Sequence, residues 1–264
     1  GCSVNTIQNY HDRIMKLIYW ANKDVRELTT KELRQYLFEY QEARDISYAT
    51  LDSIRLVFSS FYGFLEEEDY ILKSPMKRIH KIKSEQLIKT PFTDEELERI
   101  RNAAKNIRDL AIIDLLYSSG IRISELTAMN IADVDFRNRE VIVKGKGGKE
   151  RIAYFNARTK IELLDYLDTR GDRDEALFVS RRDPPVRIKP GAVQRMLKKI
   201  EIRENIPNVH PHRFRRTLAT NLLDKGMTLE QVQAILGHKR IETTLIYAQV
   251  NKESVKSNHH RFTF

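Results

Sequence analysis

Apolar side chains recur at helical spacing through the first eighty residues, and this pattern predicts a helical domain. The first stripe begins at Ile7, and a second helix opens with a capping box between Thr29 and Glu32. A third helix is expected from about Ser47, and a short fourth begins at Pro75, because proline suits the first turn of a helix. We interpret these stripes as the core of one domain and assign them no chemical role.

A lysine-bearing segment without apolar periodicity follows the helical region and is interpreted as a linker. The chain is therefore divided into a helical domain at residues 1–80, a linker at 81–92, and a larger domain with a C-terminal tail at 93–264. The larger domain opens with a second capping box, between Thr93 and Glu96. A chain of 264 residues is long enough to build a core in each domain.

The larger domain combines helices with a short β region. Strands are expected at residues 133–136, 140–144 and 151–155, and a glycine-rich turn joins the last two. Helices precede these strands and resume from Ile161, and one of the later helices is ended by Gly237. The predicted fold class is mainly α with a small antiparallel β-sheet.

Charge and cysteine content narrow the class of protein. Lys and Arg number 46 against 37 Asp and Glu, and the formal net charge of +9 favours an anionic partner, although a merely basic soluble protein has the same composition. The single cysteine, Cys2, excludes an internal disulfide and a CxxC metal site, and it fits a reducing compartment such as the cytoplasm. The sequence has no apolar run long enough to span a bilayer and no signal-peptide pattern. The chain begins at Gly1 without a methionine, and the sequence leaves open whether a native N-terminal extension is missing.

Six polar side chains form a set suited to transferring a phosphodiester to a tyrosine. The non-bridging oxygens of a phosphodiester carry negative charge and gain more in the transition state, so fixed cations are needed around them. A guanidinium meets this need because its planar fork donates two parallel hydrogen bonds, although a lone arginine is more often a solvated surface charge. A nucleophile and an acid for the leaving oxygen complete the requirement. The candidate set is Arg122, Lys146, His212, Arg215, His238 and Tyr247.

Local sequence context places several of these side chains. His212 and Arg215 are three apart, so both project from one helix face, and His212 is either a phosphate ligand, a proton carrier or a buried structural histidine. His238 follows a glycine that ends a helix and therefore lies in or beside a loop. Tyr247 is expected in an amphipathic helix. Its ordinary pKa is about 10, so it needs cationic neighbours to act as a nucleophile; otherwise it is a structural tyrosine.

Lys146 and Glu125 each admit two interpretations. Lys146, at the tip of the expected hairpin, is either a general acid whose pKa is lowered by nearby cations or a lysine that only contacts phosphate or solvent. Glu125, near Arg122, is either a carboxylate that orients the guanidinium or an exposed glutamate in a first helical turn. The basic residues beside these motifs that are expected to bind DNA are Lys144, Lys149, Arg151, Arg213, Arg216 and Lys239.

Four segments of the larger domain match, in order, the signature motifs of a known family. The segments are GIRISEL at 120–126, GKGGKER at 145–151, HRFRRTLAT at 212–220, and LGH at 236–238 with TTLIY at 243–247. The chain thus resembles the tyrosine recombinases, most of all their Xer-type and mobile-element integrase branch. The resemblance extends over roughly residues 93–250, and the first domain is similar to the family's core-binding domain only in size and position. One departure is Arg216, where many members carry histidine, and it leaves His212 in the catalytic position.

The resemblance implies a fold, a reaction and a partner. A helical core-binding domain and an α+β catalytic domain would form a C-shaped clamp around double-stranded DNA. Tyr247 would attack the DNA, and the product would be a 3′-phosphotyrosyl link with a free 5′-hydroxyl, which the hydroxyl of a partner strand reverses. No metal, ATP or other cofactor is implied, and we expect a tetramer on paired recombination sites that is a monomer or weak oligomer when free. The residues that would activate and stabilise this reaction are Arg122, Lys146, His212, Arg215 and His238.

Other functions and two arrangements of the tail remain open at this stage. A type IB topoisomerase uses a similar set of residues to relax supercoils, and a non-catalytic DNA-binding protein could share the scaffold. A histidine-based metal hydrolase is disfavoured because the seven histidines include no HExxH motif. The segment at 248–264 is expected either to pack on a neighbouring protomer or to stay with its own domain, as a short packed helix or a frayed terminus.

Overall fold

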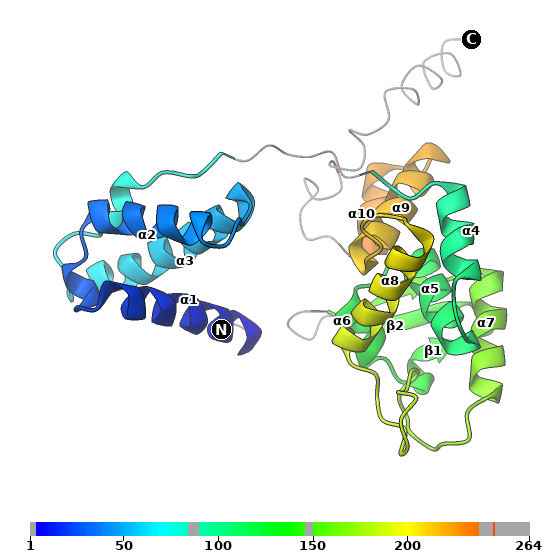
Figure 1. Cartoon of the computed structure of the whole chain (residues 1–264). Coiled ribbons are helices and arrows are strands. Elements are labelled where there is room, and N and C mark those ends of the chain that lie inside the picture. Colours follow the sequence, from blue (N-terminus) through cyan, green and yellow to red (C-terminus); the bar gives the residue numbers. More distant parts are fainter. Residues whose placement is uncertain (1–3, 84–89, 146–149, 238–244, 246–264) are drawn as a thin grey trace, which may run out of the picture. The chain divides into compact units, whose positions relative to one another are not determined.

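The computed structural model describes residues 4–83, 90–145, 150–237 and 245, and it separates into two compact units, 1–87 and 88–264 (Figure 1). Among the described residues, no helix is both long enough and apolar enough to cross a membrane.

The first unit is built from helices that pack their apolar stripes together. Its elements are α1 (Val4–Ala21), η1 (Val25–Glu27), α2 (Thr30–Glu42), α3 (Tyr48–Glu67) and η2 (Pro75–Arg78). The expected capping box is present, since Thr29 accepts from the backbone N–H of Glu32 and that glutamate accepts from the N–H of Thr29. Leu17, Phe58 and Tyr62 are fully buried at the centre of the unit. The segment at Pro75 is a 3₁₀ turn rather than the short α-helix that the sequence predicted.

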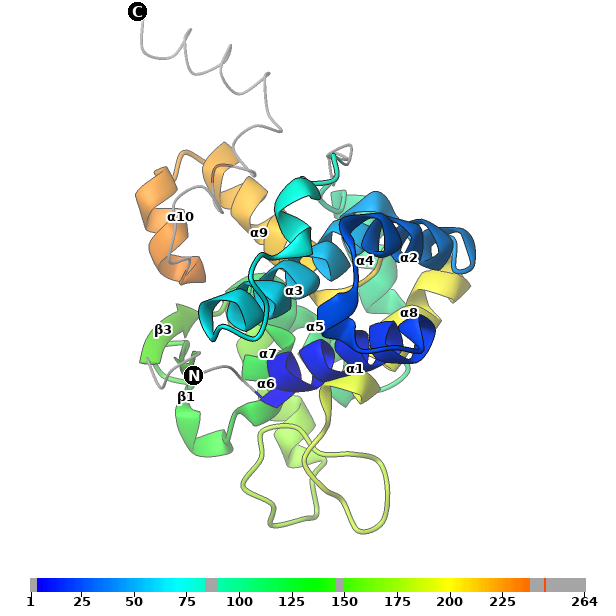
Figure 2. The same cartoon turned by 90° about the vertical axis from the view of Figure 1, so that its left-hand side faces the viewer.

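The second unit carries the remaining elements, and its helices surround α5. The helices are α4 (Asp94–Asn102), α5 (Ile107–Ser119), α6 (Ile123–Ala128), η3 (Ile131–Asp133), α7 (Ala157–Asp168), α8 (Pro190–Glu204), α9 (Pro211–Asp224) and α10 (Leu229–Leu236). Ile112, Leu115 and Leu116 of α5 are fully buried because α7 and α9 both pack against this helix. Helix α10 packs in turn against α9, and the two lie side by side in Figure 2. The second capping box, between Thr93 and Glu96, is also present at the start of α4.

A three-stranded antiparallel sheet lies beside these helices. Its strands are β1 (Val134–Asp135), β2 (Glu140–Lys144) and β3 (Glu150–Tyr154), in the order β1-β2-β3. The register pairs Val141 with Ala153, and both are buried on the face that joins the core. The mainly α fold with a small antiparallel sheet is therefore confirmed. Strand β1 is shorter than expected, and the glycine-rich turn at 146–149 lies outside the described residues.

Helix α7 begins four residues earlier than the sequence predicted. The prediction started at Ile161, the first clearly apolar position after the strands, but the helix starts at Ala157 because Asn156 caps it by accepting from the N–H of Thr159. The cap follows β3 within two residues, so the chain turns directly from the sheet into α7.

Candidate active site

Arg122 stands at the start of α6, directly after the turn that ends α5. Gly120 ends α5 in the left-handed region, at φ 59°, and Arg122 is the residue before the first turn of α6. The backbone N–H of Arg122 donates to Oε2 of Glu125 at 2.7 Å, and its Nη1 donates to Oε1 of Glu125 at 2.9 Å. The side chain of Arg122 remains 38% exposed, whereas that of Glu125 is 3% exposed. The guanidinium of Arg122 is therefore bound by a buried carboxylate, and part of its surface remains accessible to solvent.

Glu125 also binds a second arginine, Arg151 of β3. Nη1 of Arg151 donates to Oε1 at 3.0 Å and Nη2 donates to Oε2 at 3.1 Å, which is a two-pronged contact. Burial acts to raise the pKa of Glu125, but the hydrogen bonds from Arg151 and Arg122 outweigh it and hold that pKa below its usual value. Glu125 is thus a buried anion between two cations. The sequence left two interpretations of Glu125 open. The structure supports the first, in which its carboxylate orients the guanidinium of Arg122.

Arg215 of α9 is nearly enclosed and joins the ends of two helices. It is 3% exposed, and its Nη1 donates to the carbonyl oxygen of Gly120 at 2.6 Å. Its Nη2 donates to the carbonyl oxygen of Leu236, the last residue of α10. Nη2 of Arg122 lies 3.5 Å from the carbonyl oxygen of Gly237, the next residue along the chain. Arg122 and Arg215, the two arginines of the candidate set, therefore meet at the C-terminal end of α10, and we call this pair the arginine clamp.

His212 lies on the first turn of α9, on the same helix as Arg215. Its side chain is exposed, so it is not the buried structural histidine that the sequence left open. His210, which the sequence did not indicate as a candidate site residue, precedes Pro211. Its ring centroid lies 6.5 Å from that of His212. The remaining members of the candidate set, Lys146, His238 and Tyr247, lie outside the described residues, as do Lys149 and Lys239.

The basic residues expected at a DNA surface are placed in different ways. Lys144, at the end of β2, has a side chain that is 67% exposed, with its Nζ 3.9 Å from Oε1 of Glu150. Arg216 is half-buried on α9. Arg151 has a side chain that is only 17% exposed and points to Glu125. Lys144 and Arg216 therefore keep accessible surface for a phosphate, whereas Arg151 belongs to the network beneath Arg122.

Arg213 is buried and holds the segment that enters α4. Its guanidinium donates to the carbonyl oxygens of Thr90, Pro91 and Pro207, and to Oε2 of Glu96 at 2.8 Å. It also lies over the ring of Phe92, 4.0 Å from the centroid. The sequence predicted that Arg213 contacts DNA. The structure instead gives this arginine four protein acceptors, so we do not propose it as a DNA contact.

Gly237 is packed so closely on Arg151 that a side chain cannot be added without movement. Its φ is +64°, and a Cβ there would lie 2.6 Å from Cδ of Arg151. We expect Gly237→Ala to lose about 1–2 kcal/mol for the left-handed backbone and about 1–3 kcal/mol more for the collision. Thermal unfolding should show a melting temperature several degrees below that of the wild type.

Gly226 supplies the matched control for this substitution. It also lies in the left-handed region, at φ +91°, but a Cβ there would meet no atom within 4 Å. Gly226→Ala should therefore show only the backbone cost of about 1–2 kcal/mol. Equal melting temperatures for the two variants would contradict the close packing of Gly237 on Arg151.

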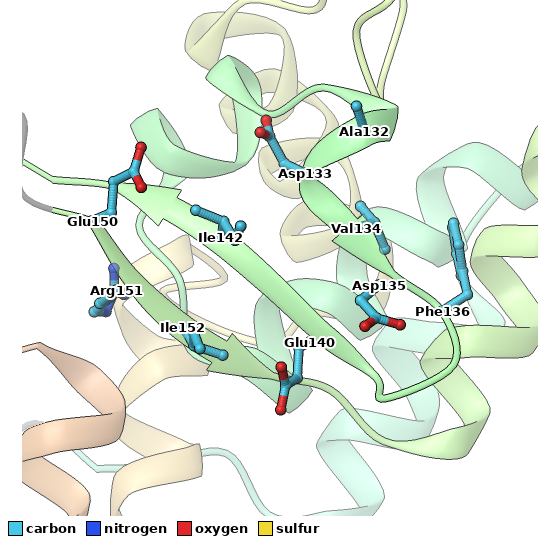
Figure 3. A pocket seen from close by; sticks show the side chains of 10 residues that line it. All are labelled: Ala132, Asp133, Val134, Asp135, Phe136, Glu140, Ile142, Glu150, Arg151 and Ile152. Atoms are coloured by element: carbon cyan, nitrogen blue, oxygen red, sulfur yellow. The ribbon is translucent and has the colours of Figure 1, made fainter.

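A separate pocket lies over the outer face of the sheet, and its chemistry differs from that of the arginine cluster. Ile142 and Ile152 are cross-strand partners on this face and are 45% and 46% exposed (Figure 3). Its charged lining residues are four carboxylates, those of Asp133, Asp135, Glu140 and Glu150, and one cation, Arg151. The four carboxylates of this pocket repel phosphate. The candidate site for a phosphodiester is therefore the pair Arg122 and Arg215.

Comparison with known proteins identifies the family of the chain. The pattern of the Phage integrase family matches residues 91–254, and that of the phage integrase N-terminal SAM-like domain matches residues 1–72. The chain is 31% identical to the tyrosine recombinase XerA of Pyrococcus horikoshii, over 97% of this chain and 87% of that one. It is 29% identical to the tyrosine recombinase XerC of Listeria welshimeri, over 97% of this chain and 91% of that one.

Solved structures share the fold. XerH recombinase bound to its palindromic difH substrate is similar with a TM-score of 0.80 at 20% identity, over 97% of this chain and 80% of that one. A lambda integrase fragment bound as a dimer to a core site has a TM-score of 0.78 at 22% identity, over 96% of this chain and 91% of that one. The extent of the sequence matches decides the family. The chain belongs to the phage integrase family and is a tyrosine recombinase, an enzyme that cleaves and rejoins DNA.

Proposed function

We propose that this recombinase exchanges strands between two specific duplex DNA sites through a 3′-phosphotyrosyl intermediate at Tyr247. The observation that carries the proposal is the pair of guanidinium groups, Arg122 and Arg215, fixed at the end of α10. Gly237 follows this end and His238 comes directly after it, and Tyr247 lies nine positions beyond His238. Two further catalytic candidates, His238 and Tyr247, therefore follow the arginine pair closely in the sequence.

The two arginines suit different parts of the same task. Arg215 is fixed in position by two hydrogen bonds, one from each Nη atom to a backbone carbonyl oxygen. Arg122 is more exposed and rests on a buried carboxylate, so its outer N–H groups can meet the non-bridging oxygens of a phosphate. A preorganised cation stabilises charge that develops in the transition state without reorganising during the reaction. We assign phosphate binding to both, and a supporting hydrogen bond or proton transfer to the exposed His212.

The proposed reaction conserves the energy of the broken bond. The Tyr247 oxygen attacks phosphorus while the bond from phosphorus to the 5′-oxygen breaks, and the tyrosine proton leaves to a nearby base. Lys146 donates a proton to the departing 5′-oxygen. The 5′-hydroxyl of a partner strand then attacks the phosphotyrosyl link and restores the phenol. We further assign His238 to activation within this set, and Lys144, Lys149, Arg216 and Lys239 to the DNA backbone.

The proposed partner is double-stranded DNA, held as paired sites by a tetramer of this chain. The relatives that support this are bound to recombination-site DNA, one as a dimer. We place the reaction in the cytoplasm, where the single cysteine and the DNA substrate both fit. A type IB topoisomerase and a non-catalytic DNA-binding protein are not favoured, since two relatives that match 97% of this chain are tyrosine recombinases.

Strand exchange between two labelled duplexes tests the function. Each duplex carries a DNA site that the protein binds specifically in a gel-shift titration, and the reaction is run in excess EDTA. We expect recombinant duplexes of the exchanged length to form although EDTA removes metal ions. Metal is not needed because the arginine charges stabilise the phosphate in its place. Relaxation of any supercoiled plasmid without exchange would favour the topoisomerase instead. Strict dependence on added Mg²⁺ would contradict the proposed metal-free chemistry.

A further inference from the structure

Arg151 lies where three segments with catalytic candidates meet. It belongs to β3, which begins four positions after Lys146. Its guanidinium binds both oxygens of Glu125 on α6. Its aliphatic part lies against Gly237 at the end of α10, at a distance that leaves no room for a Cβ. A side chain at this junction can influence the arginine clamp without touching the DNA.

The charges at the junction are unequal in their exposure. The side chain of Glu125 is 3% exposed and that of Arg151 is 17% exposed, whereas Arg122 is 38% exposed. Arg151 engages the carboxylate with both prongs of its fork, while Arg122 uses a single guanidinium nitrogen and its backbone N–H. The inner ion pair is thus Arg151 with Glu125, and Arg122 is the outer cation. The three groups together carry one positive charge, and it lies toward the exposed side.

We propose that Arg151 is a positioning residue that neutralises Glu125 and so keeps the charge and direction of Arg122 available for the scissile phosphate. Without Arg151, Arg122 would be the one cationic partner left to this carboxylate among the residues that the structure describes. The outer guanidinium would then be drawn inward and its charge offset by Glu125. The hydrogen bonds that hold the pKa of Glu125 below its usual value keep that carboxylate charged at neutral pH, so there is a full negative charge to neutralise.

A purely structural role for Arg151, as an anchor of β3, leads to a different expected result. The structural role and the proposed neutralising role can therefore be distinguished. If Arg151 only ties β3 to α6, then removing Glu125 as well cannot repair the loss. If Arg151 acts by neutralising Glu125, then removing the carboxylate charge makes Arg151 dispensable. The double variant Glu125→Gln with Arg151→Gln therefore decides between them, because its two amides replace the ion pair by a neutral pair.

The experiment measures the rate of covalent attachment to a nicked suicide duplex, with protein both below and above saturation. We expect Arg151→Gln to slow attachment at saturation by roughly tenfold to a hundredfold, with little change in the half-saturating concentration. The double variant should recover most of that loss, and Arg151→Lys should lie between, because it keeps the charge but not the fork. A double variant as slow as Arg151→Gln would overturn the proposal.

The controls separate this inference from the proposed function on which it rests. Arg158→Gln removes an arginine of the same unit that pairs at the surface with Glu98, 3.4 Å away, and it should keep the rate within about twofold. Absence of covalent product from the wild type would reject the function itself. A wild type that forms the product, together with an Arg151→Gln variant of equal rate, would reject only the role of Arg151. Thermal unfolding of every variant checks folding, and if Arg151→Gln is unfolded, the double variant and Arg151→Lys carry the test.

Discussion

Tyr247→Phe is expected to abolish covalent attachment to DNA while leaving DNA binding intact. The substitution removes one hydroxyl oxygen, which is the proposed nucleophile, and keeps the ring. Incubation with a nicked suicide duplex, followed by a denaturing gel, should show no shifted protein–DNA band. A gel-shift titration under native conditions should show an affinity close to that of the wild type.

Tyr154→Phe is the matched control. Tyr154 is 49% exposed on the outer face of the sheet, so its hydroxyl has no proposed part in the reaction. This variant should form the covalent band at the wild-type rate. A covalent band of normal intensity from Tyr247→Phe would show that another residue is the nucleophile.

Arg122→Ala and Arg215→Ala should each slow cleavage by roughly 10²–10³, the loss typical of one donor to a developing oxyanion. The two variants should differ in stability. Arg215 is 3% exposed, and its removal leaves the carbonyl groups of Gly120 and Leu236 without this donor inside the fold, so Arg215→Ala should also lower the melting temperature. Single-turnover cleavage and thermal unfolding measure the two effects separately.

Lysine substitution and a surface arginine provide the comparison for these variants. Arg122→Lys should recover only part of the rate, because an ammonium cannot reproduce the two-pronged contact with phosphate. Arg158→Ala, at a side chain that is 55% exposed, should cleave like the wild type. Cleavage within about tenfold of the wild type by both alanine variants would disprove the clamp.

Local sequence signals were enough to predict most of the framework. Capping boxes depend on residues three apart, and the ones read at Thr29 and Thr93 both occur in the structure. The left-handed glycine at Gly237 ends α10 as predicted. Periodicity was less reliable at an element's free end: Ile7 belongs to the first apolar stripe but is 59% exposed.

Contacts between distant segments could not be predicted in the same way. The pair of Glu125 and Arg151 spans 26 residues, and it exists because the register of β3 turns Arg151 toward the core. Arg213 and Arg216 are both basic residues of one motif, but only Arg213 meets the carbonyl groups of the segment before α4. Which of the two arginines is buried depends on tertiary packing, and it cannot be predicted from the spacing of residues in the sequence.

The most direct test of the central claim is the chemical identity of the protein–DNA link. Wild-type protein is trapped on a nicked suicide duplex, digested with protease and nuclease, and analysed by tandem mass spectrometry. We expect a nucleotide attached through its 3′-phosphate to the peptide that contains Tyr247, and a free 5′-hydroxyl on the released strand. Attachment to any other residue, or a link through a 5′-phosphate, would contradict the account.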